Sequence, residues 1–100
     1  MDRIRIERKI EVGHSAMGSD AAWRGDDPVY AQVTFVSAKA LPQYQQVQGV
    51  VYYDIRFHGS VDIGLKDIRF VWLNKGGKIL LPVEPPRSLE TDTKILVKEQ

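Results

Sequence analysis

The stretch Gly49–Phe57 has the pattern that most limits how this chain can fold. In an extended backbone, Val51, Tyr53, Ile55 and Phe57 lie on one side and the alternate residues lie on the other. The first side is apolar and the second is more polar. β-branched and aromatic residues, which suit a half-buried pleated surface, dominate the stretch. We therefore predict that it is the central strand of a small sheet.

The rest of the chain also has strand patterns. Arg3–Val12 alternates charged and aliphatic residues, which predicts a strand with one solvated face. Asn74–Gly77 is typical of a hairpin turn, because Asn and Gly tolerate the positive φ that such turns need. Further strands are predicted at Tyr30–Ala38, Ile68–Leu73, Lys78–Val83 and Lys94–Lys98. About six short strands predict one all-β domain over residues 1–100, either a small antiparallel β-barrel or a sandwich.

The alternating patterns also predict which side chains form the core. Each predicted member is apolar and falls on the more apolar side of its strand. The predicted core contains Ile4, Ile6, Val33, Phe35, Val51, Tyr53, Ile55, Phe70, Leu80 and Val97.

Two long loops are predicted between these strands. Gly13–Pro28 is rich in Gly, Ser and Asp and has no apolar period, so we expect a long flexible loop. Trp23 lies inside it. The favoured interpretation is that Trp23 fixes the loop to the core, and the alternative is that it contacts a partner. Lys39–Gln48 contains Pro42 and is predicted to be a loop with a short helical turn.

Composition excludes several classes of protein. The net charge of +1 gives no broad field for holding nucleic acid or an anionic membrane. The absence of cysteine excludes disulfides, thiolate catalysis and Cys-ligated zinc. No apolar run approaches the length that spans a bilayer, so no membrane association is expected.

No constellation of catalytic or metal-binding residues is recognisable. His14 and His58, the two histidines, lie in different segments and have no obvious further ligands. Gly13–Gly18 lacks the spacing of a nucleophile elbow, and Gly76–Lys78 lacks most of a phosphate-binding loop. Arg24–Asp26 spells Arg-Gly-Asp, which chance explains best in such a loop. We expect no enzymatic activity, no cofactor and no metal.

A small binding module for nucleic acid or peptide is an alternative. Arg3, Arg5, Arg8 and Lys9 make the first strand basic, with tyrosines at 52 and 53 as stacking groups. Acidic residues on the same strand dilute this face, so a mixed solvated surface is favoured.

The order of several segments along the chain is similar to that of a known family, named below. The most characteristic part is a tryptophan followed by a strand with the sequence aromatic-Ala-x-Val. The segments are Arg3–Val12, the Gly-rich loop with Trp23, Val29–Val33, the Gln-containing segment, Val51–Phe57, Asp67–Arg69, Gly77–Leu80 and Leu96–Glu99. In this order the chain resembles the head-closure, or head-tail joining, proteins of long-tailed bacteriophages. These are small β-barrel subunits that form a ring below the portal.

The resemblance implies a structural protein of the virion, assembled in the bacterial host. It would form a homo-oligomeric ring between a portal or adaptor protein and a tail protein, and would line the channel through which DNA passes without sequence recognition. The family brings no catalytic residues. We expect the subunit interface to include Trp23, Arg24 and Asp26 from the first loop and Tyr44 from the second.

Overall fold

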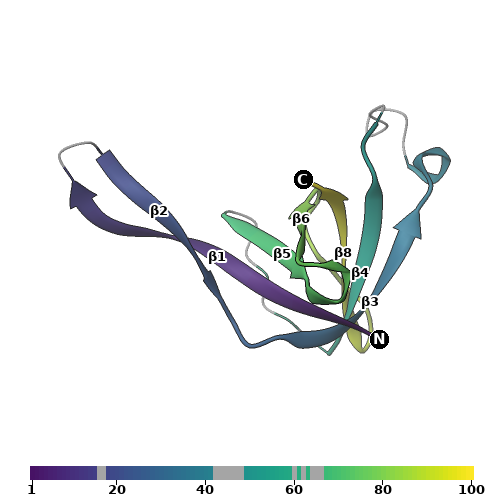
Figure 1. Ribbon diagram of the computed structural model, residues 1–100. Coiled ribbons are helices and arrows are strands. Elements are labelled where there is room, and N and C mark those ends of the chain that lie inside the picture. The colour runs from purple at the N-terminus through teal and green to yellow at the C-terminus, as the bar shows by residue number, and fades with distance from the viewer. Residues whose placement is uncertain (16–17, 42–48, 60, 62, 64–66) are drawn as a thin grey trace.

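The computed structural model describes residues 1–15, 18–41, 49–59, 61, 63 and 67–100, with the backbone alone for 11–15, 18–21 and 38. These residues form strands and two short 3₁₀ turns, η1 (Ala38–Ala40) and η3 (Leu73–Lys75). All strand pairs are antiparallel (Figure 1). The strands are β1 (Asp2–Ser15), β2 (Gly18–Gly25), β3 (Val29–Val36), β4 (Tyr52–His58), β5 (Ile68–Trp72), β6 (Lys78–Pro82), β7 (Arg87–Ser88) and β8 (Asp92–Glu99).

Six of the strands close into a barrel, in the order β1-β3-β4-β8-β6-β5 and back to β1. The closing pair is β1 with β5, in a register that runs from Ile4 opposite Trp72 to Arg8 opposite Ile68. Two further strands lie outside the barrel, β2 beside β1 and β7 beside β8. The predicted all-β barrel is confirmed, as is the Asn74–Gly77 turn, where Gly76 and Gly77 have φ of 70° and 76°.

The side chains that fill the barrel interior come from the strand faces that the alternating pattern predicted to be apolar. Ile55 of β4 is 0% exposed, and Phe57 packs against Phe70 with ring centroids 5.8 Å apart. Val33 and Tyr53 are partly buried against this cluster. Its buried members are Ile4, Ile6, Ala31, Ile55, Phe57, Ile63, Ile68, Phe70, Trp72, Leu80, Ile95 and Val97.

Two predicted core residues do not belong to this cluster. Phe35 shares the inward face of β3 with Ala31, but it lies at the end of the barrel and is 65% exposed. Val51 precedes β4 and is only half-buried. Alternation places a side chain on a face, but burial also requires the neighbouring strands to extend that far.

A second apolar cluster lies on the outer face of β4 and β8. Tyr52 is 3% exposed and packs with Leu96 and with Leu41, which follows the η1 turn. Val36, Val50 and Val83 complete it. The sequence pattern had placed Tyr52 on the more polar side, so this cluster was not predicted.

The prediction of a loop over Gly13–Pro28 is wrong. β1 continues to Ser15, and Gly18–Gly25 forms β2, which pairs with it from Gly25 opposite Glu7 to Gly18 opposite Ser15. The register shifts between Val12 and His14. Residues such as Gly, Ser, Asp and Ala are weak strand formers, but the bonds of a ladder join backbone groups and form whichever side chains are present.

Candidate interaction surface

The C-terminal half of β1 and the whole of β2 project from the barrel as a two-stranded arm (Figure 1). We define the arm as residues 9–15 and 18–25. On its other side, β1 pairs with β5 as far as Arg8. Among the described residues, one further backbone bond follows, from the Lys9 N–H to the Asp67 carbonyl at 2.8 Å. The Cα radius of gyration is 14.7 Å, whereas a compact chain of 100 residues has about 13 Å. The arm accounts for this elongated shape.

Trp23 ties the base of the arm to the outside of the barrel. The Arg69 guanidinium carbon on β5 lies 4.3 Å from the centre of the Trp23 ring. Arg69 Nε also donates to Glu7 Oε1 of β1 at 2.6 Å. The three side chains come from three neighbouring strands, so they link the arm to the closing pair of the barrel. Trp23 thus contacts a surface ion pair and not the core, and its contact with a partner remains a prediction.

The other predicted interface residues have different surroundings. Arg24 is exposed on the arm, and Asp26 follows it with Oδ2 3.8 Å from Arg8 Nε. Between them, a Cβ on Gly25 would lie 2.5 Å from Arg5 Cδ, so the Arg5 side chain covers this glycine. Tyr44 lies outside the described residues.

One end of the barrel has a row of aromatic side chains, which we call the aromatic end. It consists of Phe35, Tyr53 and Trp72. The Phe35 and Tyr53 ring centroids are 6.2 Å apart and those of Tyr53 and Trp72 are 5.1 Å apart, both edge to face. This arrangement suits the quadrupoles of the rings. Phe35 is the exposed end of the row, so it presents an apolar surface at the barrel end.

Polar groups hold the aromatic end in place. The Tyr53 hydroxyl donates to Glu99 Oε1 at 2.8 Å, and Lys78 Nζ donates to the same oxygen at 2.7 Å. The bond from Lys78, followed by that from Tyr53, holds the pKa of Glu99 below its usual range. Burial first and the bond to Glu99 second raise the pKa of Tyr53. Trp72 Nε1 donates to Asp2 Oδ1 at 3.0 Å.

Beside this end, β3 extends past the strand that closes the barrel. β1 pairs with β3 only from Ile4 opposite Val29 to Asp2 opposite Ala31. On that side, the Val33 N–H is capped by Asp2 Oδ2 at 3.3 Å. Beyond Val33, no described strand other than β4 pairs with β3. The end of β3 is therefore a sheet edge.

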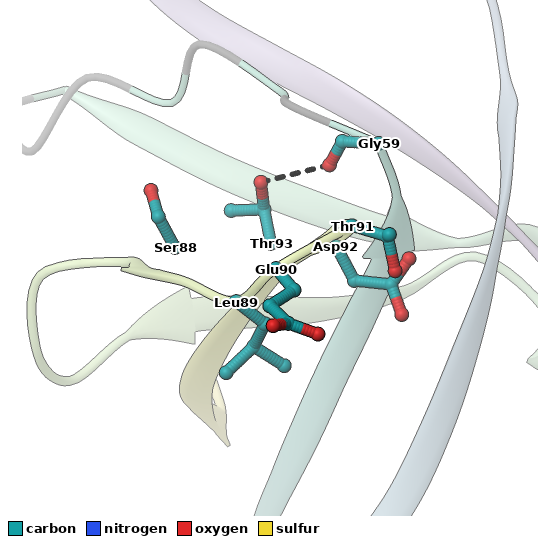
Figure 2. Close-up of a pocket in the computed structure, with 7 residues that line it drawn as sticks. All are labelled: Gly59, Ser88, Leu89, Glu90, Thr91, Asp92 and Thr93. Carbon is teal, nitrogen blue, oxygen red and sulfur yellow. Dashed lines mark hydrogen bonds between the residues drawn. The ribbon is translucent and has the colours of Figure 1, made fainter.

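A small pocket of about 150 Å³ lies where β4 ends and β8 begins (Figure 2). Beside it, Asp92 accepts from Arg56 Nε at 2.5 Å, and Asp92 Oδ1 lies 3.3 Å from His58 Nδ1. The Arg56 hydrogen bond is the main cause that lowers the pKa of Asp92. The Thr93 hydroxyl donates to the Gly59 carbonyl at 3.0 Å. The lining is Gly59, Ser88, Leu89, Glu90, Thr91, Asp92 and Thr93.

This pocket is too small for most ligands, and its carboxylate is already paired with a guanidinium. Within the described part of the chain, no group of three or more metal-ligating side chains occurs. Nor is any helix in that part long and apolar enough to cross a membrane. The arm and the aromatic end are therefore the stronger candidates for a functional surface.

Comparison with known proteins supports the fold. No family model matches the chain, and no curated protein matches it. Among solved structures, the solution structure of protein SF1141 from Shigella flexneri 2a is similar, with a TM-score of 0.74 and 23% sequence identity. The match covers 99% of this chain and 91% of that one. The similarity extends over almost the whole chain and concerns the fold.

Proposed function

We propose that the protein is a head-tail connector subunit of a long-tailed bacteriophage, forming a ring between the portal or adaptor and the tail. The resemblance of the sequence to head-closure proteins motivates the proposal. The ring would surround the channel for DNA, and the protein would act as a structural part of the virion.

The arm is the observation that best supports a role in assembly. A two-stranded hairpin is at best marginally stable alone in water. Here Trp23 secures the base of the arm. Within the described chain, however, β2 pairs only with β1, so its other edge is free. A projecting strand edge is a template for pairing with another chain. An assembly subunit can use such an edge to bind its neighbour.

The alternative, a nucleic-acid or peptide module with stacked tyrosines, has less support. Tyr52 is buried within the second apolar cluster, and Tyr53 packs between Phe35 and Trp72 at the aromatic end. Of the basic residues of β1, Arg5 covers Gly25 and Arg8 lies 3.8 Å from Asp26. These contacts give little support to the stacking face that this alternative needs.

The proposal is tested in the phage itself. Disrupting the gene in an inducible prophage that carries it should give DNA-filled heads and separate tails, and a plasmid copy should restore complete particles. Mass spectrometry should find the chain in purified virions. Normal infectious particles that lack the chain would refute the proposal.

A further inference from the structure

The backbone geometry of the arm shows which residues carry its free edge. The Asp26 N–H donates to the Ile6 carbonyl of β1 at 3.0 Å. Peptide groups two residues apart in a strand point to the same side. Arg24 therefore directs its peptide groups toward β1, and Trp23 directs its own toward the outer edge of β2. The Lys9 N–H, opposite Trp23, points toward β5, as this alternation requires.

The same reasoning identifies the free peptide groups of β3. The Val33 N–H points to the side where Asp2 caps it. Phe35, two residues further on, directs its N–H and C=O to that side as well. Among the described residues nothing pairs with these groups. The Phe35 ring meets Tyr53 edge to face, but most of its surface is exposed. Phe35 therefore offers both an unpaired backbone edge and an exposed apolar surface within the described chain.

These two edges match each other but cannot meet within one molecule. The arm leaves one side of the barrel and the end of β3 lies on the other side (Figure 1). A contact between them is therefore between different surfaces of two copies, and a contact of this kind repeats into a ring or a filament. Each copy carries both halves, which is why a second copy is the occupant that the structure favours.

We propose that β2 of one copy adds to the free edge of β3 in the next, as antiparallel strands with Trp23 opposite Phe35. This inference rests on the proposed function in that it names the partner of the arm as the next subunit of the ring. Trp23 and Phe35 form the hydrogen-bonded pair, because both direct their peptide groups to the joined edges. Their side chains lie on one face of the extended sheet as a cross-strand aromatic pair.

The register predicts one cross-link. Arg24 and Thr34 become a directly opposed pair without hydrogen bonds, whose Cα atoms lie about 4.5 Å apart. This separation suits a disulfide. Both side chains are exposed, and the chain has no cysteine of its own. Under mild oxidation, an equimolar mixture of R24C and T34C should give a disulfide dimer, and the double variant should give a ladder of oligomers.

The controls separate this contact from chance collision. E90C replaces an exposed residue away from both edges, so E90C mixed with T34C should give no dimer. Phe35→Lys in the double variant should abolish the ladder, because an edge lysine opposes strand addition. Leu89→Lys, another exposed apolar residue changed to lysine, should leave it intact. Thermal melts should show that both lysine variants remain folded.

Three results would overturn the inference. The first is a dimer of R24C alone, which would mean that two β2 edges pair symmetrically. The second is a ladder that survives Phe35→Lys. The third is the absence of any cross-link at every protein concentration. The proposed function fails separately, because it depends on the presence of the chain in virions. A chain that is in virions but does not cross-link refutes this contact alone. One that cross-links but is absent from virions refutes the phage role.

Discussion

Arg69 and Trp23 are 46 positions apart in the chain, yet the Arg69 guanidinium carbon lies 4.3 Å from the centre of the Trp23 ring. The contact joins the projecting arm to β5 of the barrel. Glu7 holds Arg69 from the other side. The arm is thus fixed at its base by one aromatic side chain placed over an ion pair.

We expect Trp23→Ala to loosen the arm without unfolding the barrel. A cation–π contact at a partly exposed site contributes about 1 kcal/mol, so amide exchange over Gly18–Gly25 should become roughly fivefold faster. Exchange in β4 should not change. Trp23→Phe keeps a ring over Arg69 and serves as the control. Equal exchange in Trp23→Ala and the wild type would show that the stacking does not hold the arm.

Two substitutions on the paired strands β3 and β4 should differ in their effect on stability, because one residue is in the core and the other is exposed at the barrel end. Ile55→Ala should lower the free energy of unfolding by about 2–5 kcal/mol, because a fully buried side chain leaves a cavity. Phe35→Ala should change it by less than about 0.5 kcal/mol, since most of that ring is already in water. Urea denaturation measures both. A large loss for Phe35→Ala in the isolated protein would place Phe35 in the core.

Acid should destabilise the protein partly through Glu99. The pKa of Glu99 is lowered on folding, chiefly by Lys78. Its contribution is therefore present above the pKa of the unfolded chain and is lost as the pH falls through the folded pKa. Between about pH 6 and pH 3 the melting temperature of the wild type should fall more than that of Glu99→Gln. Parallel curves for the two proteins would contradict this assignment.

The β5–β6 turn offers a test of backbone conformation alone. Gly76 has φ of 70°, and a Cβ there would meet no atom within 4 Å. Gly76→Ala should therefore cost about 1–2 kcal/mol through conformation only. Gly76→Asn should cost less, because Asn tolerates this region better. Chemical denaturation of the two variants gives the comparison, and equal losses would argue against a left-handed residue here.

The features predicted from the sequence are those that depend on local pattern. Ile55 and Phe57 alternate within one strand, and their inward direction follows from that alternation. The exposure of Phe35 depends instead on where β1 begins to pair with β3. The burial of Tyr52 depends on Leu41, which packs against it from another part of the chain. Neither of these neighbours can be read from the residues beside Phe35 or Tyr52.

The arm was missed for a different reason. Its second strand has the composition of a loop, and only backbone pairing with β1 makes it a strand. A sign was present in the sequence, because the alternation of β1 persists through Ile10 and Val12, beyond the length that the barrel uses. Trp23 was predicted to be an interface residue because of its type, but its position on an arm was not predicted.

β1 is continuous from the closing pair of the barrel into the arm. A force that pulls the arm along this strand acts parallel to β1 and across its hydrogen bonds to β5. In that shear geometry all of the β1–β5 hydrogen bonds bear the load at once. A force that peels β1 away from β5 would instead break these bonds one at a time. If the arm binds a neighbour as proposed, tension through it would act along the direction in which the barrel is mechanically stronger.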